Sequence, residues 1–379
     1  MKWVNFLHIY QPPTQSKETL ELVTHESYEK IISLLEKFPK LKLTMNIAGS
    51  LIELLENNGK ENVLRKLAAF VADGRIELVG SAMYHPILPL IHEDEITQQI
   101  QLHNDISKKW FGENYKPKGF YFPEMAYSKE AAAIVQKMGF DWTILDERQI
   151  SSEKINPGVK YILKDSGLAA IFRNHKISYH FPPESVFSDP ETLKYSYLIT
   201  AHDGELYGHW HKDDRGFYDK AFSNPEINFL TASEYLGEIK TEKLIEVPES
   251  NWESVPEDIK NGIPFALWNH PDNLIHNDLW SLAKQANSII NLNLNDPHID
   301  GAKRHFHRGL ASCAWWWASN QKIGPFSSLC WNPTEIEKGA RELLAAIQTL
   351  KNADSDSRIQ FEKKFGDLRD NIWTSHWRK

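Results

Sequence analysis

The chain has 379 residues, enough to bury the core of one large domain or of two. Its formal charge of -8 provides no basic surface for nucleic acid or for an anionic membrane. No window approaches the roughly 18 apolar residues of a membrane helix. Its two cysteines, Cys313 and Cys330, give neither a disulfide framework nor a metal-finger spacing. We therefore expect a cytoplasmic protein with no nucleic-acid or membrane partner.

The N-terminal segment "MKWVNFLHIYQPP" has a short apolar run and no small-residue cleavage site. We interpret it as a first β-strand and not as a signal peptide. Residues 27–38 then place apolar side chains on one face at helical spacing. A second strand is expected at 41–47, and Ser50 is expected to cap a helix over 51–58.

The same alternation of strand and helix continues along the chain. Further strands are expected at 75–81, 118–124, 140–147, 169–173 and 195–200, and further helices at 96–111 and 128–139. Strands that alternate with helices imply right-handed crossovers and a parallel sheet. We expect a closed or nearly closed α/β barrel of the incomplete (β/α)7 type. An open doubly wound sheet is the rival, but no Gly-rich phosphate loop follows the first strand.

From about Asn273 onward the pattern becomes helical. Helices are expected at 278–292, 302–320, 333–350 and 357–373. We therefore predict two domains, a catalytic barrel over 1–272 and a helical C-terminal bundle over 273–379 that packs on it. The predicted helix over 302–320 contains three consecutive tryptophans, Trp315–Trp317. Consecutive helical residues point in different directions, so at most one or two of these rings are expected at the barrel mouth.

Polar side chains follow four of the expected strands. These residues are His8 with Gln11, Glu77, Glu124, and Asp203 with Glu205. The carboxyl ends of parallel strands lie on one face of a barrel, so the four clusters are expected to converge on one pocket.

Each of these residues also has an ordinary explanation. His8 could be a satisfied structural histidine, and Glu77 could face solvent in a run of alternating polarity. Glu124 could open a helix, where a carboxylate complements the dipole. Asp203 followed by Gly204 is an ordinary turn pair. The coincidence of clusters at separate strand ends favours a functional site.

Paired carboxylates among aromatic side chains suit glycoside hydrolysis. This reaction needs one carboxylate as nucleophile or base and one carboxylic acid that protonates the leaving oxygen. Glu124 and Asp203 follow different strands, so they could flank a scissile bond from opposite sides. Their pKa values must then differ, and Glu205 and His209 could supply that difference.

A metal-dependent hydrolase is the main competitor from the residues alone. The pairs "HWH" at 209–211 and "HFH" at 305–307 resemble ligand pairs. Neither has the i, i+4 spacing of a helical zinc motif. Alternating histidines would share a face on a strand but diverge on a helix. We expect no metal and no cofactor.

Four segments together resemble glycoside hydrolase family 57, the α-amylase, 4-α-glucanotransferase and glucan-branching family. They are "HIYQPP", "GRIELVGSAMYHPILPLI", "GFYFPEMAYS" and "HDGELYGHW", and they occur in the family's order. The resemblance implies an incomplete (β/α)7 barrel and a retaining mechanism on α-glucans. It implies that Glu124 is the nucleophile and Asp203 the general acid/base, with carboxyl groups about 5–5.5 Å apart.

An oligo- or polysaccharide is the partner implied by this resemblance. The expected substrate-binding residues are His8, Gln11, Glu77, His85, Glu205, His209, Trp210 and Trp268. Two departures from the family pattern stand out. Tyr10 takes the place of the second histidine of the first motif, and the candidate fifth motif, "ASCAWWWAS", lacks the Asp found there in many members.

Two other functions remain open. A metal-dependent polysaccharide deacetylase would need an Asp pair after the first strand and a His-x-x-x-His pair, but Ser81 stands four residues before His85. A non-catalytic glycan-binding homologue would keep the fold without turnover. The sequence does not decide between hydrolysis and transfer, and it fixes neither linkage, sugar, chain length nor oligomeric state.

Overall fold

A computed structural model describes residues 1–150, 152–321 and 329–378. The chain forms two compact units. The first comprises residues 1–11, 15–83 and 88–253, and the second comprises residues 12–14, 84–87 and 254–379. The domain boundary expected at residue 273 stays a prediction. Among the described residues, no helix is both long enough and apolar enough to cross a membrane.

The strands of the described residues lie in the first unit. They are β1 (Lys2–Ile9), β2 (Leu43–Ile47), β3 (Ile76–Leu78), β4 (Gly119–Phe120), β5 (Trp142–Asp146), β6 (Lys160–Leu163), β7 (Ala169–Arg173), β8 (Tyr197–Asp203), β9 (Asn228–Leu230) and β10 (Glu242–Ile245). The helices of this unit are α1 (Lys17–Val23), α2 (Glu29–Lys37), α3 (Gly49–Asn57), α4 (Glu61–Ala72), α5 (Glu93–Phe111), α6 (Lys129–Lys137), α7 (His175–Ser178), α8 (Pro182–Ser185), α9 (Phe217–Phe222) and α10 (Ala232–Glu238).

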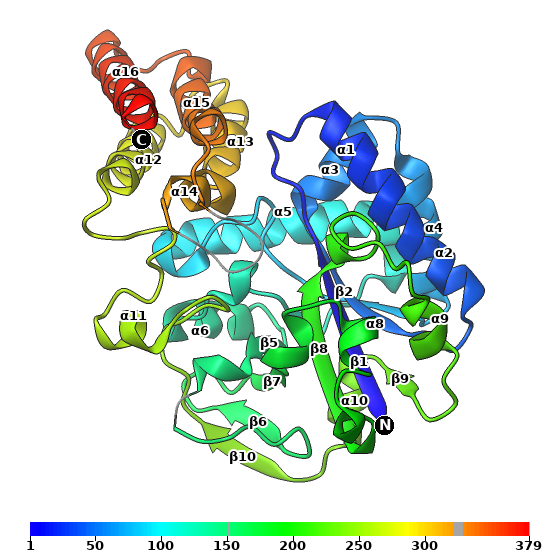
Figure 1. Cartoon of the computed structure of the whole chain (residues 1–379). Coiled ribbons are helices and arrows are strands. Elements are labelled where there is room, and N and C mark those ends of the chain that lie inside the picture. Colours follow the sequence, from blue (N-terminus) through cyan, green and yellow to red (C-terminus); the bar gives the residue numbers. More distant parts are fainter. Residues whose placement is uncertain (151, 322–328, 379) are drawn as a thin grey trace. The chain divides into compact units, whose positions relative to one another are not determined.

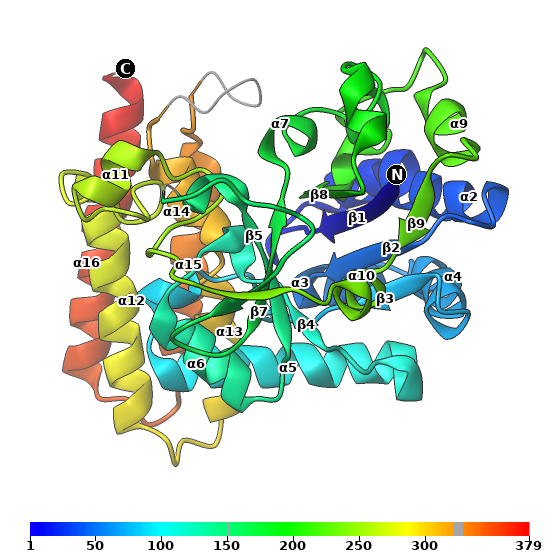
Figure 2. The ribbon, with the colours of Figure 1, turned by 90° about the horizontal axis from the view of Figure 1, so that it is seen from below.

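Within the described residues, seven parallel strands are linked into a ring. One sheet has the order β3-β2-β1-β8, and the other contains β7-β5-β4. Main-chain hydrogen bonds join the two sheets at both sides: Tyr121 N donates to Gly80 O at 2.8 Å, and Asn174 N donates to Ile199 O at 2.8 Å. Strand β9 pairs with the start of β1, and β6 and β10 extend the second sheet beyond β7. Figures 1 and 2 show β1 and β8 side by side among these strands.

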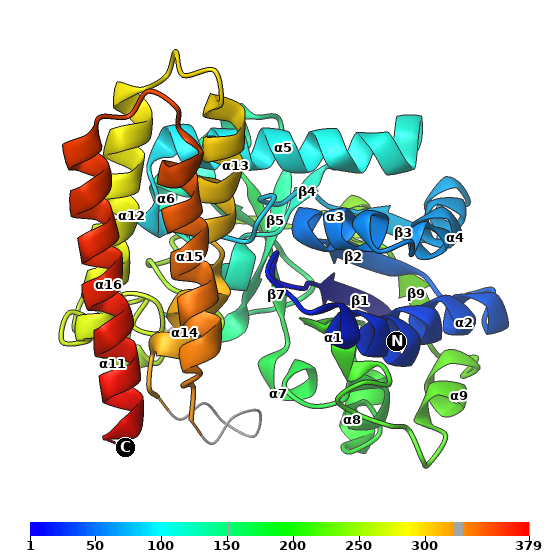
Figure 3. The ribbon, with the colours of Figure 1, turned by 90° about the horizontal axis from the view of Figure 1, so that it is seen from above.

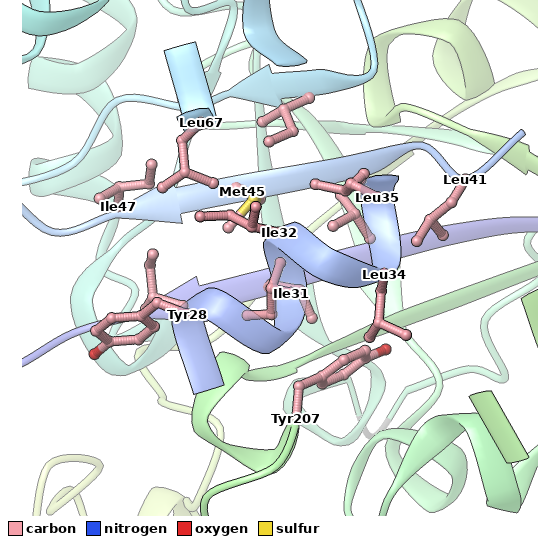
Figure 4. Close-up of a cluster of buried hydrophobic side chains, with 14 of the residues drawn as sticks. Tyr28, Ile31, Ile32, Leu34, Leu35, Leu41, Met45, Ile47, Leu67 and Tyr207 are labelled. Carbon is pink, nitrogen blue, oxygen red and sulfur yellow. The ribbon is translucent and has the colours of Figure 1, made fainter. Parts of the chain in front are cut away.

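Helix α2 illustrates how the helical periodicity builds the core. Ile31, Ile32, Leu34 and Leu35 are buried, as the spacing over 27–38 predicts. Figure 4 shows Ile32 beside Met45 of β2 and Leu34 beside Tyr207, with further apolar side chains around them. Burying a side chain of this size contributes about 1.5–3 kcal/mol, so this face holds the helix against the sheet.

The expectation that Ser50 caps a helix is wrong. Helix α3 begins at Gly49 and its N-cap residue is Ala48, so Ser50 lies inside the first turn. Its hydroxyl instead donates a hydrogen bond of 2.8 Å to the carbonyl of Gln11, and its amide donates to Met83 O at 2.8 Å. The Ser50 hydroxyl therefore bonds the distant Gln11 carbonyl in place of a local helix amide. This hydrogen bond fixes the backbone just after β1.

The second unit is helical in its described residues. Its helices are α11 (Pro256–Lys260), α12 (Leu274–Leu292), α13 (Ile299–Gly309), α14 (Ser312–Ala318), α15 (Pro333–Thr349) and α16 (Ser355–Trp377). Helices α12, α13, α15 and α16 lie side by side as a bundle (Figure 3). The apolar faces of α12 and α15 are buried within this bundle, which accounts for their strong helical periodicity.

The single helix expected over 302–320 is two helices. The chain breaks at Ala311, whose backbone is extended with φ -56° and ψ 130°. The amide of Ser312 then donates to the carbonyl of His85 at 3.1 Å. A Cβ on Gly309 would lie 2.6 Å from Leu343, so the two helices that contain these residues pack closely just before the break. These contacts override a helical pattern that continues through the sequence.

Candidate active site

Register places three polar side chains in one row across the sheet. His8 on β1 pairs with Asn46 on β2 and with Asp203 on β8. Paired residues of adjacent strands point to the same face, so these side chains share one side of the sheet. Nδ1 of His8 lies 2.7 Å from Oδ1 of Asn46. Burial lowers the pKa of His8 to about 4 although this hydrogen bond opposes the shift, so the imidazole is neutral at neutral pH.

Tyr121, which follows β4, stacks on His8 with ring centroids 4.6 Å apart. Its side chain is fully buried, and its hydroxyl has no hydrogen-bond partner among the described residues. Burial raises the pKa of this phenol, and the charges of Glu124 and Asp203 raise it further. The charges of Glu124 and Asp203 therefore both raise the pKa of the same buried hydroxyl.

Glu124 lies in a tight turn, Pro123–Met125, directly after β4. Its backbone is left-handed at φ 58° and ψ 19°, a conformation that costs a residue with a Cβ about 1 kcal/mol or more. Nε1 of Trp252 donates to Oε2 of Glu124 at 2.9 Å, and the Trp252 amide donates to the Glu124 carbonyl at 3.2 Å. Trp252 thus donates hydrogen bonds to both the side chain and the backbone of Glu124, which fixes the direction of the carboxylate.

Asp203 ends β8 and has a pKa raised well above its ordinary value. Burial is the main cause, followed by the negative charges of Glu205 and Glu124. The positive charge of Arg173 acts in the opposite direction, and Glu253 adds a smaller upward shift. The carboxyl group of Asp203 is therefore favoured in its protonated form.

Glu205 is buried at 3% exposure and has three donors around one oxygen. The Tyr28 hydroxyl donates to its Oε1 at 2.7 Å, Gln11 Nε2 at 3.3 Å and the Tyr10 amide at 3.4 Å. Burial raises the pKa of Glu205, while these hydrogen bonds oppose the shift. Tyr28 is the last residue of a π-helical turn, Thr24–Tyr28, an irregularity that is frequent at functional sites.

Two residues of this constellation were not expected from the sequence. The guanidinium carbon of Arg173 lies 4.9 Å from the ring centre of Trp252, and Arg173 Nε lies 2.6 Å from Oδ2 of Asp146. Arg173 is the last residue of the predicted strand 169–173. The rule that a polar residue at a strand end marks the site, used for Asp203, would therefore have selected Arg173 as well. Trp252 follows β10 in an irregular segment and carries no comparable signal.

The structure gives Glu77 a different neighbourhood from that of His8. Glu77 pairs with Thr44, which pairs with Phe6, so it lies two residues nearer the N-terminal end of the sheet than His8. Its Oε2 accepts from the Ser233 amide at 2.9 Å, and its other oxygen accepts from the Ser233 hydroxyl. The carboxylate therefore lies at the N-terminal end of α10, and its role in substrate binding stays a prediction.

His209 and Trp210 lie beyond Glu205 in the segment that follows β8. Nδ1 of His209 lies 2.7 Å from Oε2 of Glu26, which belongs to the π-helical turn. The Trp210 side chain is 53% exposed. An exposed ring of this kind offers a flat apolar surface, so Trp210 stays a candidate for stacking on a sugar ring.

The remaining predicted substrate-binding residues, His85 and Trp268, belong to the second unit. Nδ1 of His85 lies 3.0 Å from the Ser312 hydroxyl. Trp268 is fully buried, and its carbonyl accepts from Trp280 Nε1 at 2.9 Å. Their predicted contact with substrate stays a prediction.

The histidine pairs considered as metal ligands have other contacts. His209 lies against Glu26, and His211 stacks on Phe181 with ring centroids 4.1 Å apart. His305 lies 2.7 Å from Glu342. Within the described part of the chain, no group of three or more His, Cys, Asp or Glu side chains could hold a metal ion.

Comparison with known proteins identifies the family. Residues 4–248, more than half of the chain, match the model of glycosyl hydrolase family 57, and the chain belongs to this family. It is 26% identical over 284 residues to an α-amylase of Pyrococcus horikoshii, an alignment that covers 68% of this chain and 44% of that protein. It is 25% identical over 284 residues to a 4-α-glucanotransferase of Thermococcus litoralis, which covers 68% of this chain and 42% of that protein. The chain thus spans less than half the length of these curated relatives.

Solved structures confirm the predicted fold class, an incomplete (β/α)7 barrel with a helical C-terminal part. The 4-α-glucanotransferase of Thermococcus litoralis matches with a TM-score of 0.71 at 20% identity, over 93% of this chain and 60% of that chain. A GH57-type branching enzyme from Pyrococcus horikoshii matches with a TM-score of 0.70 at 18% identity, over 99% of this chain and 95% of that chain. The family assignment does not favour the deacetylase or the binding-only alternative.

Proposed function

We propose that the chain is a retaining glycoside hydrolase or transglycosylase that acts on α-glucans, with Glu124 as nucleophile and Asp203 as general acid/base. The curated relatives are named as α-amylases and 4-α-glucanotransferases, which supports this substrate class. The observation that carries the proposal is the different environment of the two carboxyl groups.

The two carboxyl groups have different polar surroundings. An N–H donor from Trp252 points at Oε2 of Glu124, and a hydrogen bond of this kind stabilises a carboxylate anion. Burial and the charges of Glu205 and Glu124 raise the pKa of Asp203, which favours its acid form. The raised pKa of Asp203, next to a Glu124 carboxylate that accepts an indole N–H, supports the assignment of Asp203 as acid and Glu124 as nucleophile.

The reaction then proceeds in two displacements. Glu124 attacks the anomeric carbon while Asp203 gives its proton to the departing glycosidic oxygen, so that a glycosyl-enzyme ester forms and the leaving sugar departs. The now ionised Asp203 takes a proton from water or from a sugar hydroxyl, which attacks the anomeric carbon and restores the Glu124 carboxylate. Water yields hydrolysis and a second sugar yields transfer.

The proposal is tested with Glu124→Gln and Asp203→Asn on amylose and maltoheptaose. We expect both variants to lose most of the turnover, while Glu242→Gln, an exposed carboxylate paired with Lys160, keeps it. Smaller sugars alone indicate hydrolysis, and longer sugars indicate transfer. Proton NMR of the first-formed anomer checks retention, and a 5-fluoro-glucosyl fluoride should label Glu124 in a peptide map. Full activity of both site variants would refute the assignment.

We also propose a cytoplasmic location and an oligo- or polysaccharide partner. The location is supported by a chain with two cysteines, too few for the disulfide framework of many secreted proteins. Cell fractionation with an antibody against the chain tests it, and recovery of the protein outside the cytoplasm contradicts it.

A further inference from the structure

Arg173 is a buried cation that three separate segments hold. Its side chain is 5% exposed, and its Nε lies 2.6 Å from Oδ2 of Asp146 on β5. Its Nη1 donates to the carbonyl of Ala201 on β8 at 2.7 Å. Its guanidinium lies over the ring of Trp252 at 4.9 Å. A buried guanidinium persists only where its charge and its donors are satisfied, and here they are satisfied on three sides.

Asp146, the anion that pairs with Arg173, is itself tightly constrained. Its side chain is fully buried, and Nδ1 of His175 lies 2.9 Å from Oδ2. Arg148 approaches Oδ1 at 3.3 Å through Nε and at 2.9 Å through its amide. Burial alone would raise the pKa of Asp146, but the charge of Arg173 and the His175 hydrogen bond lower it below its ordinary range. Asp146 is therefore favoured in its anionic form, which keeps it paired with Arg173.

Trp252 lies between this ion pair and Glu124. The Arg148 guanidinium donates to the Trp252 carbonyl, and the Arg173 guanidinium covers the ring. On the other side, Nε1 of Trp252 donates to Oε2 of Glu124 at 2.9 Å. The contacts thus form one continuous path from Asp146 through Arg173 and Trp252 to the carboxylate of Glu124.

We propose that Arg173, locked by Asp146, is a positioning residue that holds the indole N–H of Trp252 against the Glu124 carboxylate. This inference rests on the proposed function, because it assigns Glu124 as the nucleophile. Arg173 acts through Trp252, because its guanidinium covers the indole ring whose Nε1 donates to Glu124. A displacement of a nucleophile by about 1 Å can cost about 100-fold in rate, so a support of this kind affects kcat.

The charge of Arg173 has a second effect on the same site. It lowers the pKa of Asp203, which burial and the charges of Glu205, Glu124 and Glu253 raise. The charge of Arg173 also acts on Asp146, Glu253, His202 and Tyr121. Removal of the Arg173 charge therefore leaves Asp203 protonated to a higher pH. The alkaline limb of the kcat/KM profile, where activity is lost as Asp203 ionises, then moves to higher pH.

Two substitutions separate the geometry from the charge. Arg173→Gln removes the charge and the ring contact, and we expect kcat to fall about 10- to 100-fold and the alkaline limb to move to higher pH. Arg173→Lys keeps the charge but cannot reach Asp146 and Ala201 with one planar group, so kcat should fall while the limb stays near that of the natural protein. Arg75→Gln is the matched control, because Arg75 donates to the carbonyls of Leu35, Phe38 and Leu41 and has no part in the site.

A readout that needs no turnover keeps this inference separate from the proposed function. In protein labelled with 5-fluorotryptophan, the fluorine resonance missing from Trp252→Phe identifies Trp252. We expect Arg173→Gln and Asp146→Asn to move this resonance and Arg75→Gln to leave it in place. An unmoved resonance together with an unchanged kcat and alkaline limb in Arg173→Gln overturns the positioning role. If Glu124→Gln and Asp203→Asn both keep full activity, the proposed function fails, and the fluorine resonance alone then decides whether Arg173 positions Trp252.

Discussion

The indole nitrogen of Trp252 donates a hydrogen bond of 2.9 Å to Oε2 of Glu124, a residue 128 positions earlier in the chain. The same tryptophan donates its backbone amide to the Glu124 carbonyl at 3.2 Å. We expect Trp252→Phe to keep the ring and lose the donor, so kcat should fall by about tenfold to a hundredfold with a small change in KM. Steady-state kinetics on maltoheptaose measure this. Trp377→Phe, at a ring 78% exposed, is the control, and equal rates for the two variants would contradict the assigned role of the hydrogen bond.

Glu205 is expected to set the alkaline limb of the pH profile. Its negative charge is the largest electrostatic contribution that raises the pKa of Asp203. Because Asp203 acts as an acid, activity is lost as pH rises through its pKa. Glu205→Gln removes the charge, lowers the pKa of Asp203 and should move the alkaline limb of kcat/KM to lower pH. The profile is measured beside that of Glu242→Gln, which should coincide with the natural protein; an upward shift for Glu205→Gln would refute the assignment.

Glu77 is expected to stabilise the fold through α10. Its carboxylate accepts from the Ser233 amide in the first turn of that helix, and a negative charge there complements the helix dipole. Glu77→Gln should lower the free energy of unfolding by about 1–2 kcal/mol, measured by urea denaturation. Glu130→Gln, an exposed carboxylate in the first turn of α6, is the comparison. An unchanged stability with a raised KM would instead support the sugar-binding role that the family resemblance implies.

Gly80 is expected to tolerate no side chain. It follows β3 and forms a parallel bridge with Phe120 of β4, and a Cβ there would lie 2.4 Å from the ring of Phe140. Gly80→Ala should therefore destabilise the protein by about 1–3 kcal/mol through overpacking. A Cβ on Gly237, in α10, would meet nothing within 4 Å, so Gly237→Ala should be neutral or stabilising by up to about 1 kcal/mol. Thermal denaturation of both variants checks the contrast, which fails if they unfold together.

Acid should destabilise the fold through buried neutral histidines. Burial lowers the pKa of each of His8, His103, His202 and His276 to about 4, from an ordinary 6.5. The unfolded chain binds more protons than the folded one in this range, so the free energy of unfolding should fall as pH drops from 6.5 towards 4. Urea titrations at several pH values measure the slope. His103→Gln should reduce the slope, and an identical slope would show that His103 is already charged in the folded protein.

Strand-end reasoning could place the candidate carboxylates because each of them follows directly on a strand. The expected strand at 195–200 delivers Asp203, and the expected strand at 118–124 delivers Glu124. The family resemblance rests on the same segments. The parallel arrangement that the strand–helix alternation indicates is present between β1 and β8, and the structure adds the register that pairs His8 with Asp203.

What sequence reasoning missed depends on long-range contacts. Trp252 reaches Glu124 from an irregular segment after β10, and no local pattern marks it. The level of Glu77 in the sheet is also set by long-range contacts, because its register with Thr44 and Phe6 places it two residues from the level of His8. Register between strands depends on the packing of the whole sheet, so a single sequence cannot provide it.

The number of residues in the π-helical turn Thr24–Tyr28 determines where the Tyr28 side chain points relative to Glu205. A π-turn holds one residue more than an α-turn, and this extra residue sets the direction of the Tyr28 hydroxyl towards Glu205. Deleting one residue from the turn would let it wind as an ordinary α-helix and rotate the following side chains by about 100°. The phenol would then leave Glu205, and homologous chains that keep this contact must also keep the extra residue.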